Sequence, residues 1–212
     1  MARRDLVQPD MNIVAICGSL REVSYTRLAL QVALRGAEAI GAQTSLIDLR
    51  DYDLPFCDGR KDRRAYPEDV VRLRHAVRAA QGIILGTPVY HGSYSGVLKN
   101  ALDLMGFPEF EGRMVGLVGV AGGRTGAVHA LNALRAVGRV LHAWVIPEEV
   151  SIPTVSRAFD ETGQPKDPEL EQRLMEVGRQ VARFAYLHTS EHALEFLKLW
   201  ESAPVNPGAA DQ

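Results

Sequence analysis

Hydroxyl and guanidinium groups gather in one short stretch of the chain, Gly18-Ser19-Leu20-Arg21-Glu22-Val23-Ser24-Tyr25-Thr26, directly after an apolar run. Hydroxyls, an arginine and the unpaired N–H groups of a helix N-terminus suit a phosphate group, which carries a charge of about −1.5 to −2. The stretch matches neither G-x-x-x-x-G-K-S/T nor G-x-G-x-x-G, so it indicates a terminal monophosphate rather than a P-loop nucleotide or a Rossmann dinucleotide. The alternative is that Ser24 only caps the helix and Arg21 is solvated.

A second stretch whose residues could take part in ligand binding is Thr87-Pro88-Val89-Tyr90-His91-Gly92-Ser93-Tyr94-Ser95-Gly96-Val97-Leu98-Lys99-Asn100-Ala101-Leu102-Asp103. Pro88 and Gly92 can fix the backbone in a shape that lets its N–H and C=O groups approach a planar heterocycle closely. Tyr90 offers an aromatic wall beside such a ring. Lys99 and Asp103 lie one helical turn apart, and pairing or packing explains them better than chemistry does.

Glycines dominate a third stretch, Gly122-Gly123-Arg124-Thr125-Gly126. A backbone without side chains lets a ring stack close by, so contact with a cofactor ring is one interpretation. A plain turn between a strand and a helix also favours glycine, which is the other interpretation. Arg124 either binds a cofactor phosphate or is solvated.

Each of these stretches follows a predicted strand and precedes a predicted helix. The predicted strands are residues 12–17, 44–49, 82–87, 113–120 and 143–146, and the predicted helices are residues 24–40, 67–80, 95–104, 127–138 and 169–187. The unbroken apolar centres of the third and fourth strands are typical of strands buried on both faces. Regular alternation of strand and helix predicts one parallel sheet with helices on both faces.

This pattern predicts a flavodoxin-like three-layer α/β/α sandwich with a five-stranded parallel sheet in the order 2-1-3-4-5. Strands 1 and 3 are neighbours in such a doubly wound sheet, and a crevice opens at their carboxyl ends. The first two stretches border that crevice, and the third reaches the same edge. We expect residues 1–11 to form a flexible arm, residues 12–187 the domain, and residues 188–212 an extra helix over 191–200 followed by a disordered tail.

Composition limits the classes of partner. The 212 residues carry a formal net charge of −2, and 46% of them are hydrophobic. This balance fits one globular domain and predicts no attraction to nucleic acid or to an anionic membrane. The sequence shows neither a signal peptide nor an apolar run long enough to span a bilayer, and Cys17 and Cys57 do not make a disulfide framework. We therefore expect a cytoplasmic protein.

Other chemistry finds little support in the sequence. His188 and His192 are four residues apart, but HTSEH does not match the zinc motif H-E-x-x-H, so we expect no metal site. His75, His129 and His142 lack the spacing of metal ligands or of a catalytic triad, and no serine lies in a G-x-S-x-G motif. The sequence therefore gives hydrolysis no support and identifies no catalytic side chain.

The two motifs GSLREVS and TPVYHGSYSGVLKNALD, each after the correct strand, resemble the NADPH-dependent FMN reductase family. The resemblance extends over roughly residues 12–186 and implies FMN as the cofactor. It implies a phosphate site at Ser19, Arg21, Ser24, Tyr25 and Thr26, and a ring site at Pro88, Val89, Tyr90, His91, Gly92, Ser93, Gly122, Gly123 and Arg124. Thr26 and His91 stand where the family often has asparagine. We expect phosphate binding to survive the first difference, and the second to alter acceptor preference.

The resemblance also implies an activity. Hydride would pass from NADPH or NADH to FMN, and electrons would then pass to a small-molecule acceptor: free flavin, a quinone, an azo compound or a metal ion. Members commonly form oligomers, which implies a homodimer or homotetramer. Two alternatives remain, a flavodoxin-type electron carrier and a flavin-binding regulatory module, both without NAD(P)H turnover. A net charge of −2 gives the carrier little support, because carriers usually dock through a strongly acidic surface.

Overall fold

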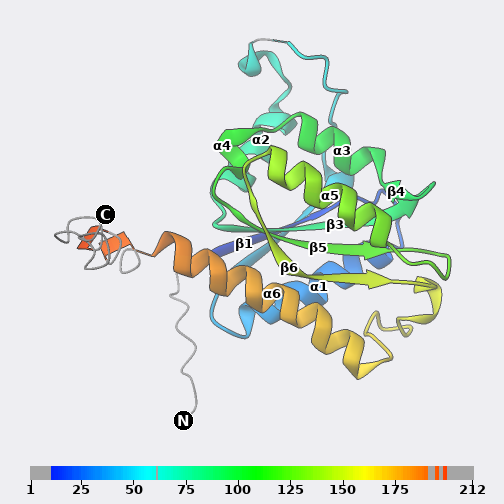
Figure 1. The fold of residues 1–212 in the computed structure, drawn as a ribbon. Coiled ribbons are helices and arrows are strands. Elements are labelled where there is room, and N and C mark those ends of the chain that lie inside the picture. The colour runs from blue at the N-terminus through cyan, green and yellow to red at the C-terminus, as the bar shows by residue number, and fades with distance from the viewer. Residues whose placement is uncertain (1–10, 61, 191–193, 196–197, 200–212) are drawn as a thin grey trace, which may run out of the picture.

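A parallel sheet of five strands, with one short antiparallel strand added, forms the centre of the described chain (Figure 1). The computed structural model describes residues 11–60, 62–190, 194–195 and 198–199. The strands are β1 (Asn12–Cys17), β2 (Gln43–Asp48), β3 (Gly82–Tyr90), β4 (Ser93–Tyr94), β5 (Met114–Val120) and β6 (Trp144–Ile152). The parallel strands are paired in the order β2-β1-β3-β5-β6, and β4 pairs antiparallel with the end of β3.

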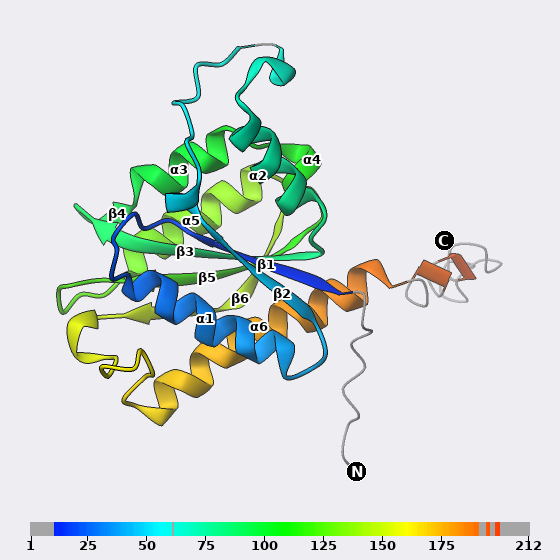
Figure 2. The ribbon, with the colours of Figure 1, turned by 180° about the vertical axis from the view of Figure 1, so that it is seen from behind.

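Helices cover both faces of the sheet. They are α1 (Tyr25–Glu38), α2 (Glu68–Arg78), α3 (Gly96–Asp103), α4 (Phe107–Phe110), α5 (Val128–Val140) and α6 (Pro168–Thr189), with short 3₁₀ turns at η1 (Leu49–Asp51), η2 (Arg63–Ala65) and η3 (Val155–Arg157). Helices α1 and α6 lie on one face, and α2, α3 and α5 lie on the other (Figures 1 and 2). Because strand side chains alternate, Ile84 joins the core under α1 and α6 while Ile83 joins the core under α2, α3 and α5.

Helices α1 and α6 approach each other at backbone distance. A Cβ atom built on Gly36 would overlap the carbonyl group of Met175, and one built on Gly178 would overlap the carbonyl oxygen of Ala33. Only glycine leaves room for this approach. The two helices therefore form one tightly packed layer beneath the sheet.

The predicted fold class is confirmed, with differences in the strands. All five predicted strands are present, and the first has the predicted bounds. The short strand β4 was not predicted, so the expected order 2-1-3-4-5 becomes β2-β1-β3-β5-β6 in this numbering. Strand β6 continues to Ile152, beyond the predicted end of this strand at residue 146. A register shift opposite Val115 and Leu117 accommodates the added length, and β6 is an edge strand, where proline is tolerated.

The helices agree closely with the expected ranges. The five predicted helices all end within two residues of the predicted positions, and the single-turn helix α4 was not predicted. Ser24 and Ser95 accept hydrogen bonds that cap α1 and α3, as their residue type favours. None of the described helices is both long and apolar enough to cross a membrane.

The two ends of the chain are described only in part. Met11, the last residue of the predicted arm, is buried, and its carbonyl accepts a hydrogen bond from the Gln43 N–H at 2.8 Å. Residues 1–10 lie outside the described residues. Of the predicted helix over 191–200, residues 194–195 and 198–199 are helical, and the rest of that helix and the predicted tail lie outside the described residues.

Candidate functional site

The first predicted loop, residues 18–24, leaves the carboxyl end of β1 and is tied to the segment that follows β3. The Gly18 N–H donates to the Gly86 carbonyl at 2.8 Å, and the Ser95 hydroxyl donates to the Gly18 carbonyl at 2.6 Å. A Cβ atom on Gly18 would lie 2.7 Å from the Cβ of Leu98, so a side chain cannot be placed there without a shift. Packing therefore requires glycine at this position and holds the two loops together.

Ser95 has a larger part in this junction than its sequence position suggested. Its N–H donates to the Thr87 hydroxyl at 2.9 Å, and its own hydroxyl accepts from the Leu98 N–H at 3.1 Å. Both Ser95 and Thr87 are fully buried. Neither was among the predicted site residues. The cap at Ser95 was a visible signal, but its bond to a residue 77 positions earlier was not.

Ser24 caps α1. Its hydroxyl accepts from the Arg27 N–H at 3.2 Å, and the Ser19 hydroxyl accepts weakly from the Arg21 N–H at 3.4 Å. Both serines are buried. The first turn of a helix carries N–H groups without partners inside the helix and the positive end of its dipole. An anion placed at this end of the loop would meet both.

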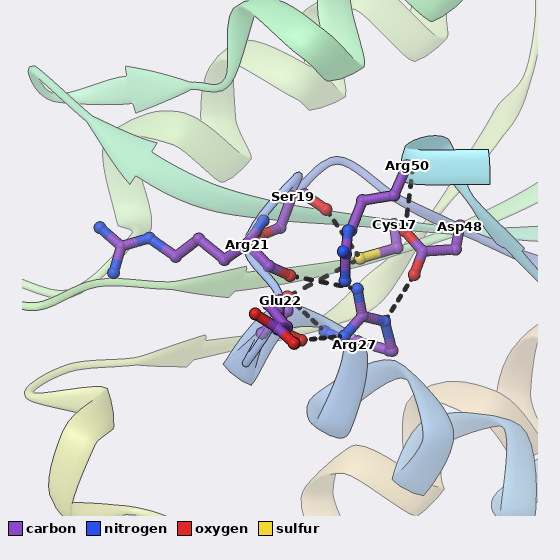
Figure 3. Close-up of polar contacts among 8 residues, drawn as sticks. Cys17, Ser19, Arg21, Glu22, Arg27, Asp48 and Arg50 are labelled. Atoms are coloured by element: carbon purple, nitrogen blue, oxygen red, sulfur yellow. Dashed lines mark hydrogen bonds and ion pairs between the residues drawn. The ribbon is translucent and has the colours of Figure 1, made fainter. Parts of the chain in front are cut away.

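Arg27 holds the first loop from the side of β2 (Figure 3). Its Nε donates to the Asp48 carboxylate at 2.6 Å, and its Nη atoms donate to the backbone carbonyls of Glu22 at 2.9 Å and Arg21 at 3.2 Å. The exposed side chain of Arg21 points away from the Arg27–Asp48 pair (Figure 3). Sequence reasoning missed Arg27 and Asp48, which fix the shape of the loop while Arg21 remains open to solvent.

Two other residues that were predicted to bind the phosphate lie deeper in the protein. The Tyr25 ring stacks on Phe159 with centroids 5.9 Å apart, and Thr26 is buried in the first turn of α1. Cys17 lies beneath the loop, where its Sγ is 3.9 Å from the Ser24 hydroxyl. Burial raises the pKa of the Cys17 thiol, so the thiol stays neutral and behaves as the small core residue that the sequence predicted.

The second predicted loop is a hairpin rather than an irregular segment. Strand β3 continues to Tyr90, and Val89 and Tyr90 pair with Tyr94 and Ser93 of β4. The turn between the strands contains His91 at φ 50° and Gly92 at φ 84°, the positive values that a two-residue hairpin turn needs. Asparagine tolerates this left-handed region well, which gives a backbone reason for its frequency at the position of His91. Pairing with β4 thus fixes the backbone that we expected Pro88 to fix.

The glycine stretch follows β5, and hydrogen bonds to residues at and just beyond the carboxyl end of β6 hold it in place. The Thr154 N–H donates to the Gly123 carbonyl at 3.0 Å, and the Ala127 N–H donates to the Ser151 hydroxyl at 2.7 Å. A Cβ atom on Gly126, whose φ is 71°, would lie 2.6 Å from that hydroxyl. Gly122 and Gly123 differ, because a Cβ atom on either would meet no protein atom within 4 Å. Arg124 is exposed.

The hairpin and the glycine stretch border an open hollow of about 290 Å³, which we call the glycine hollow. Its lining residues are Val89, Gly92, Ala121, Gly122, Gly123, Thr125, Gly126, His129 and Ala130. Strands β1, β3 and β5 are neighbours in the sheet, so the first loop ends at the same edge as the hollow. The structure therefore brings the three predicted stretches together. Among the described residues, no cluster of His, Cys, Asp or Glu could hold a metal ion.

The family with which this geometry agrees is identified by sequence. The model of the family described as NADPH-dependent FMN reductase matches residues 11–157. The chain belongs to the NADPH-dependent FMN reductase family. It is therefore an oxidoreductase of this family, which confirms the resemblance seen in its two motifs.

Individual members of the NADPH-dependent FMN reductase family agree with this assignment. The chain is 34% identical over 158 residues to an NADPH azoreductase of Bacillus sp. (strain OY1-2), covering 74% of this chain and 85% of that one. It is 33% identical over 159 residues to an NAD(P)H-dependent FMN reductase of Pseudomonas aeruginosa, covering 73% and 84%. Among solved structures, a flavoenzyme NAD(P)H:acceptor oxidoreductase from Paracoccus denitrificans matches with a TM-score of 0.65 at 23% identity, covering 84% and 98%. The comparison with the solved structure shows that the two proteins share the same fold.

Proposed function

We propose that this chain binds FMN at the carboxyl edge of its sheet and reduces it with NADPH or NADH. The observation that carries the proposal is the open space beside Gly122 and Gly123. Packing does not require glycine at either position, since a Cβ atom would touch nothing. A bare backbone facing a hollow suits the close approach of a planar ring. The residues present therefore fit the cofactor that the family name implies.

The phosphate of FMN would occupy the first loop. The N-terminus of α1, Ser19, Ser24 and Thr26 would contribute backbone and hydroxyl donors, and Arg21 would contribute charge. Tyr25 also stays in this proposal as a neighbour of the phosphate. The preorganised loop supports the proposal, because Arg27 and Ser95 already hold its backbone through hydrogen bonds.

The ring of FMN would lie against the hairpin and the glycine stretch. Pro88, Val89, Tyr90, His91, Gly92 and Ser93 would contact it from one side, and Gly122, Gly123 and Arg124 from the other. When bound, FMN supplies the redox chemistry, accepting hydride from the nicotinamide and passing electrons to the acceptor. The protein's contribution is to bind and orient the partners and to offer backbone N–H groups to developing negative charge.

We do not assign the basic residues near position 60 to the nicotinamide cofactor. Arg60 pairs with Asp58 at 2.6 Å, and its guanidinium holds the pKa of the Asp58 carboxyl well below its usual range. Arg63 pairs with Glu109 at 3.1 Å, and Arg64 with Asp62 at 3.2 Å. Each of these arginines already has a carboxylate partner, and Glu109 also pairs with Arg78. The proposal therefore includes both NADPH and NADH as donors.

The acceptor in this proposal is a small molecule: free flavin, a quinone, an azo compound or a metal ion. We also propose a homodimer or homotetramer, which is supported by the large exposed fractions of Phe56 (86%) and Val23 (73%). Light scattering of the purified protein measures this directly. The free thiols of Cys17 and Cys57 support a reducing compartment such as the cytoplasm.

The experiment that tests the function is anaerobic mixing of FMN-loaded protein with NADPH and, separately, with NADH. Rapid bleaching of the visible flavin absorbance by either donor is the expected result, and the faster donor is the preferred one. Saturable FMN binding without bleaching by either would instead indicate the carrier or the regulatory module. Failure to bind FMN would overturn the proposal.

A further inference from the structure

One imidazole, the side-chain type that generally exchanges protons near neutral pH, lines the glycine hollow. His129 lies in the first turn of α5 and is exposed, so water reaches it. The other lining residues are glycine, alanine, Val89 and Thr125, none of which is an acid at this pH. Imidazole changes its charge between about pH 5 and 8, which makes it the usual general acid of enzymes. Among the lining residues, His129 is therefore the side chain whose type is suited to transfer a proton.

Reduction of some acceptors requires such a proton. A quinone becomes a hydroquinone by gaining two electrons and two protons, and an azo group becomes a hydrazine by the same balance. A hydride supplies both electrons and one proton. The second proton must come from water or from an acid beside the acceptor. Ferricyanide differs, because each molecule gains one electron and no proton.

We propose that His129 donates this second proton to quinone or azo acceptors that bind against the flavin ring at the glycine hollow. The inference rests on the proposed function and names the class of acceptor that the hollow serves. In this step an N–H bond of the imidazolium breaks, and an O–H bond to the quinone or an N–H bond to the azo nitrogen forms. The neutral imidazole then regains a proton from water.

The neighbouring charged and titratable groups are few. Tyr90, His91 and Tyr94 lie on the hairpin that borders the hollow, and Arg124 lies on the glycine stretch. Further along α5, Arg135 pairs with Glu149 at 2.6 Å, and Arg139 lies one turn beyond. His91 is the other imidazole on these two segments, but it is at the exposed tip of the hairpin and is not among the residues that line the hollow.

The test compares acceptors in His129→Gln, with tetramethyl-1,4-benzoquinone as the proton-requiring acceptor and ferricyanide as the control. We expect quinone turnover to fall by about 10²-fold, the lower range for a general acid, while ferricyanide turnover and the rate of flavin reduction by NADPH stay at the wild-type values. His75→Gln, an exposed histidine on α2, is the matched control and should leave all rates unchanged. His129→Ala serves as a second variant.

A measurement independent of turnover completes the test. In the NMR spectrum of the oxidised, FMN-loaded protein, the ring resonance that is lost in His129→Gln should shift when the quinone is added, and the resonance that is lost in His75→Gln should not. Equal loss of quinone and ferricyanide turnover, wild-type quinone rates in His129→Gln, or the same loss in His91→Gln alone would overturn the inference. Wild-type protein that is not reduced by NADPH or NADH would instead overturn the proposed function.

Discussion

The two glycine-bearing loops at the carboxyl edge of the sheet differ in what occupies the space beside their α-carbons. Beside Gly18 lie protein atoms, the Cβ of Leu98 at 2.7 Å and the carbonyl oxygen of Gly86 at 2.9 Å from an added Cβ. Beside Gly122 and Gly123 no protein atom lies within 4 Å. Packing explains the first glycine, whereas packing does not explain the other two, and the proposed approach of the FMN ring does. Glycine in a sequence motif thus has two meanings, which the structure separates.

The largest effect on the fold is expected from Gly18→Ala. The added methyl group must displace Leu98 or the Gly86 carbonyl, and overpacking of this kind costs about 3 kcal/mol of unfolding free energy. Urea unfolding of the protein without flavin measures this cost. Gly96→Ala is the control, because a Cβ atom there meets nothing within 4 Å and the residue begins α3. Equal stability of the two variants would remove the distinction between the loops.

Ser95→Ala should have the next largest effect. It removes the hydroxyl that donates to the Gly18 carbonyl and accepts from the Leu98 N–H, leaving two buried groups without this partner. Loss of such bonds costs about 2 kcal/mol. Thermal unfolding compared with the exposed-residue variant Ser156→Ala provides the measurement. A melting temperature equal to that of Ser156→Ala would mean that the two loops are joined by other contacts.

Gly122→Ala and Gly123→Ala should leave the stability of the fold nearly unchanged and weaken FMN binding instead. Neither Cβ atom meets protein, so the unfolding free energy should change by less than about 0.5 kcal/mol. Each methyl group nevertheless enters the space proposed for the ring, and we expect FMN to bind at least about tenfold more weakly, a loss of about 1.4 kcal/mol. Fluorescence titration with FMN measures the affinity. Undiminished affinity in both variants would place the ring elsewhere.

Arg21→Ala should affect the fold least, because the side chain is exposed and points away from the Arg27–Asp48 pair. A charged hydrogen bond to phosphate contributes about 1.5 kcal/mol or more, so FMN affinity should fall about tenfold. Riboflavin, which lacks the phosphate, should bind wild type and variant equally. If the affinity for both ligands falls together, Arg21 contacts the ring and not the phosphate.

The parts of the site that the sequence predicted are those set by local pattern. Buried strands, helix starts at Ser24 and Ser95, and the edge where the three stretches meet follow from apolar periodicity, capping and strand alternation. The supports of the site could not be predicted in this way. Arg27 reaches Asp48 on another strand, and Ser95 reaches Gly18 across 77 residues, so both contacts depend on the tertiary fold.

The hairpin at His91 and Gly92 was not predicted for a different reason, which is that its local sequence signal is weak. The two positive φ angles and the short strand β4 give the second stretch a regular structure, yet the pair His-Gly is a weaker turn signal than Asn-Gly. The length of β6 was missed because Pro147 and two glutamates interrupt its apolar pattern. At an edge strand such residues are tolerated, and being at the edge is a property of the assembled sheet.

The dense layer formed by α1 and α6 has a consequence for biosynthesis. Val181 of α6 packs directly under the sheet, 2.6 Å from a Cβ atom built on Gly82 and 2.7 Å from one built on Gly116. While the ribosome is still making residues 168–189, a nascent chain that already contains every strand has an uncovered apolar face. Because domains generally complete folding as units, this face of the core closes only once α6 has been synthesised.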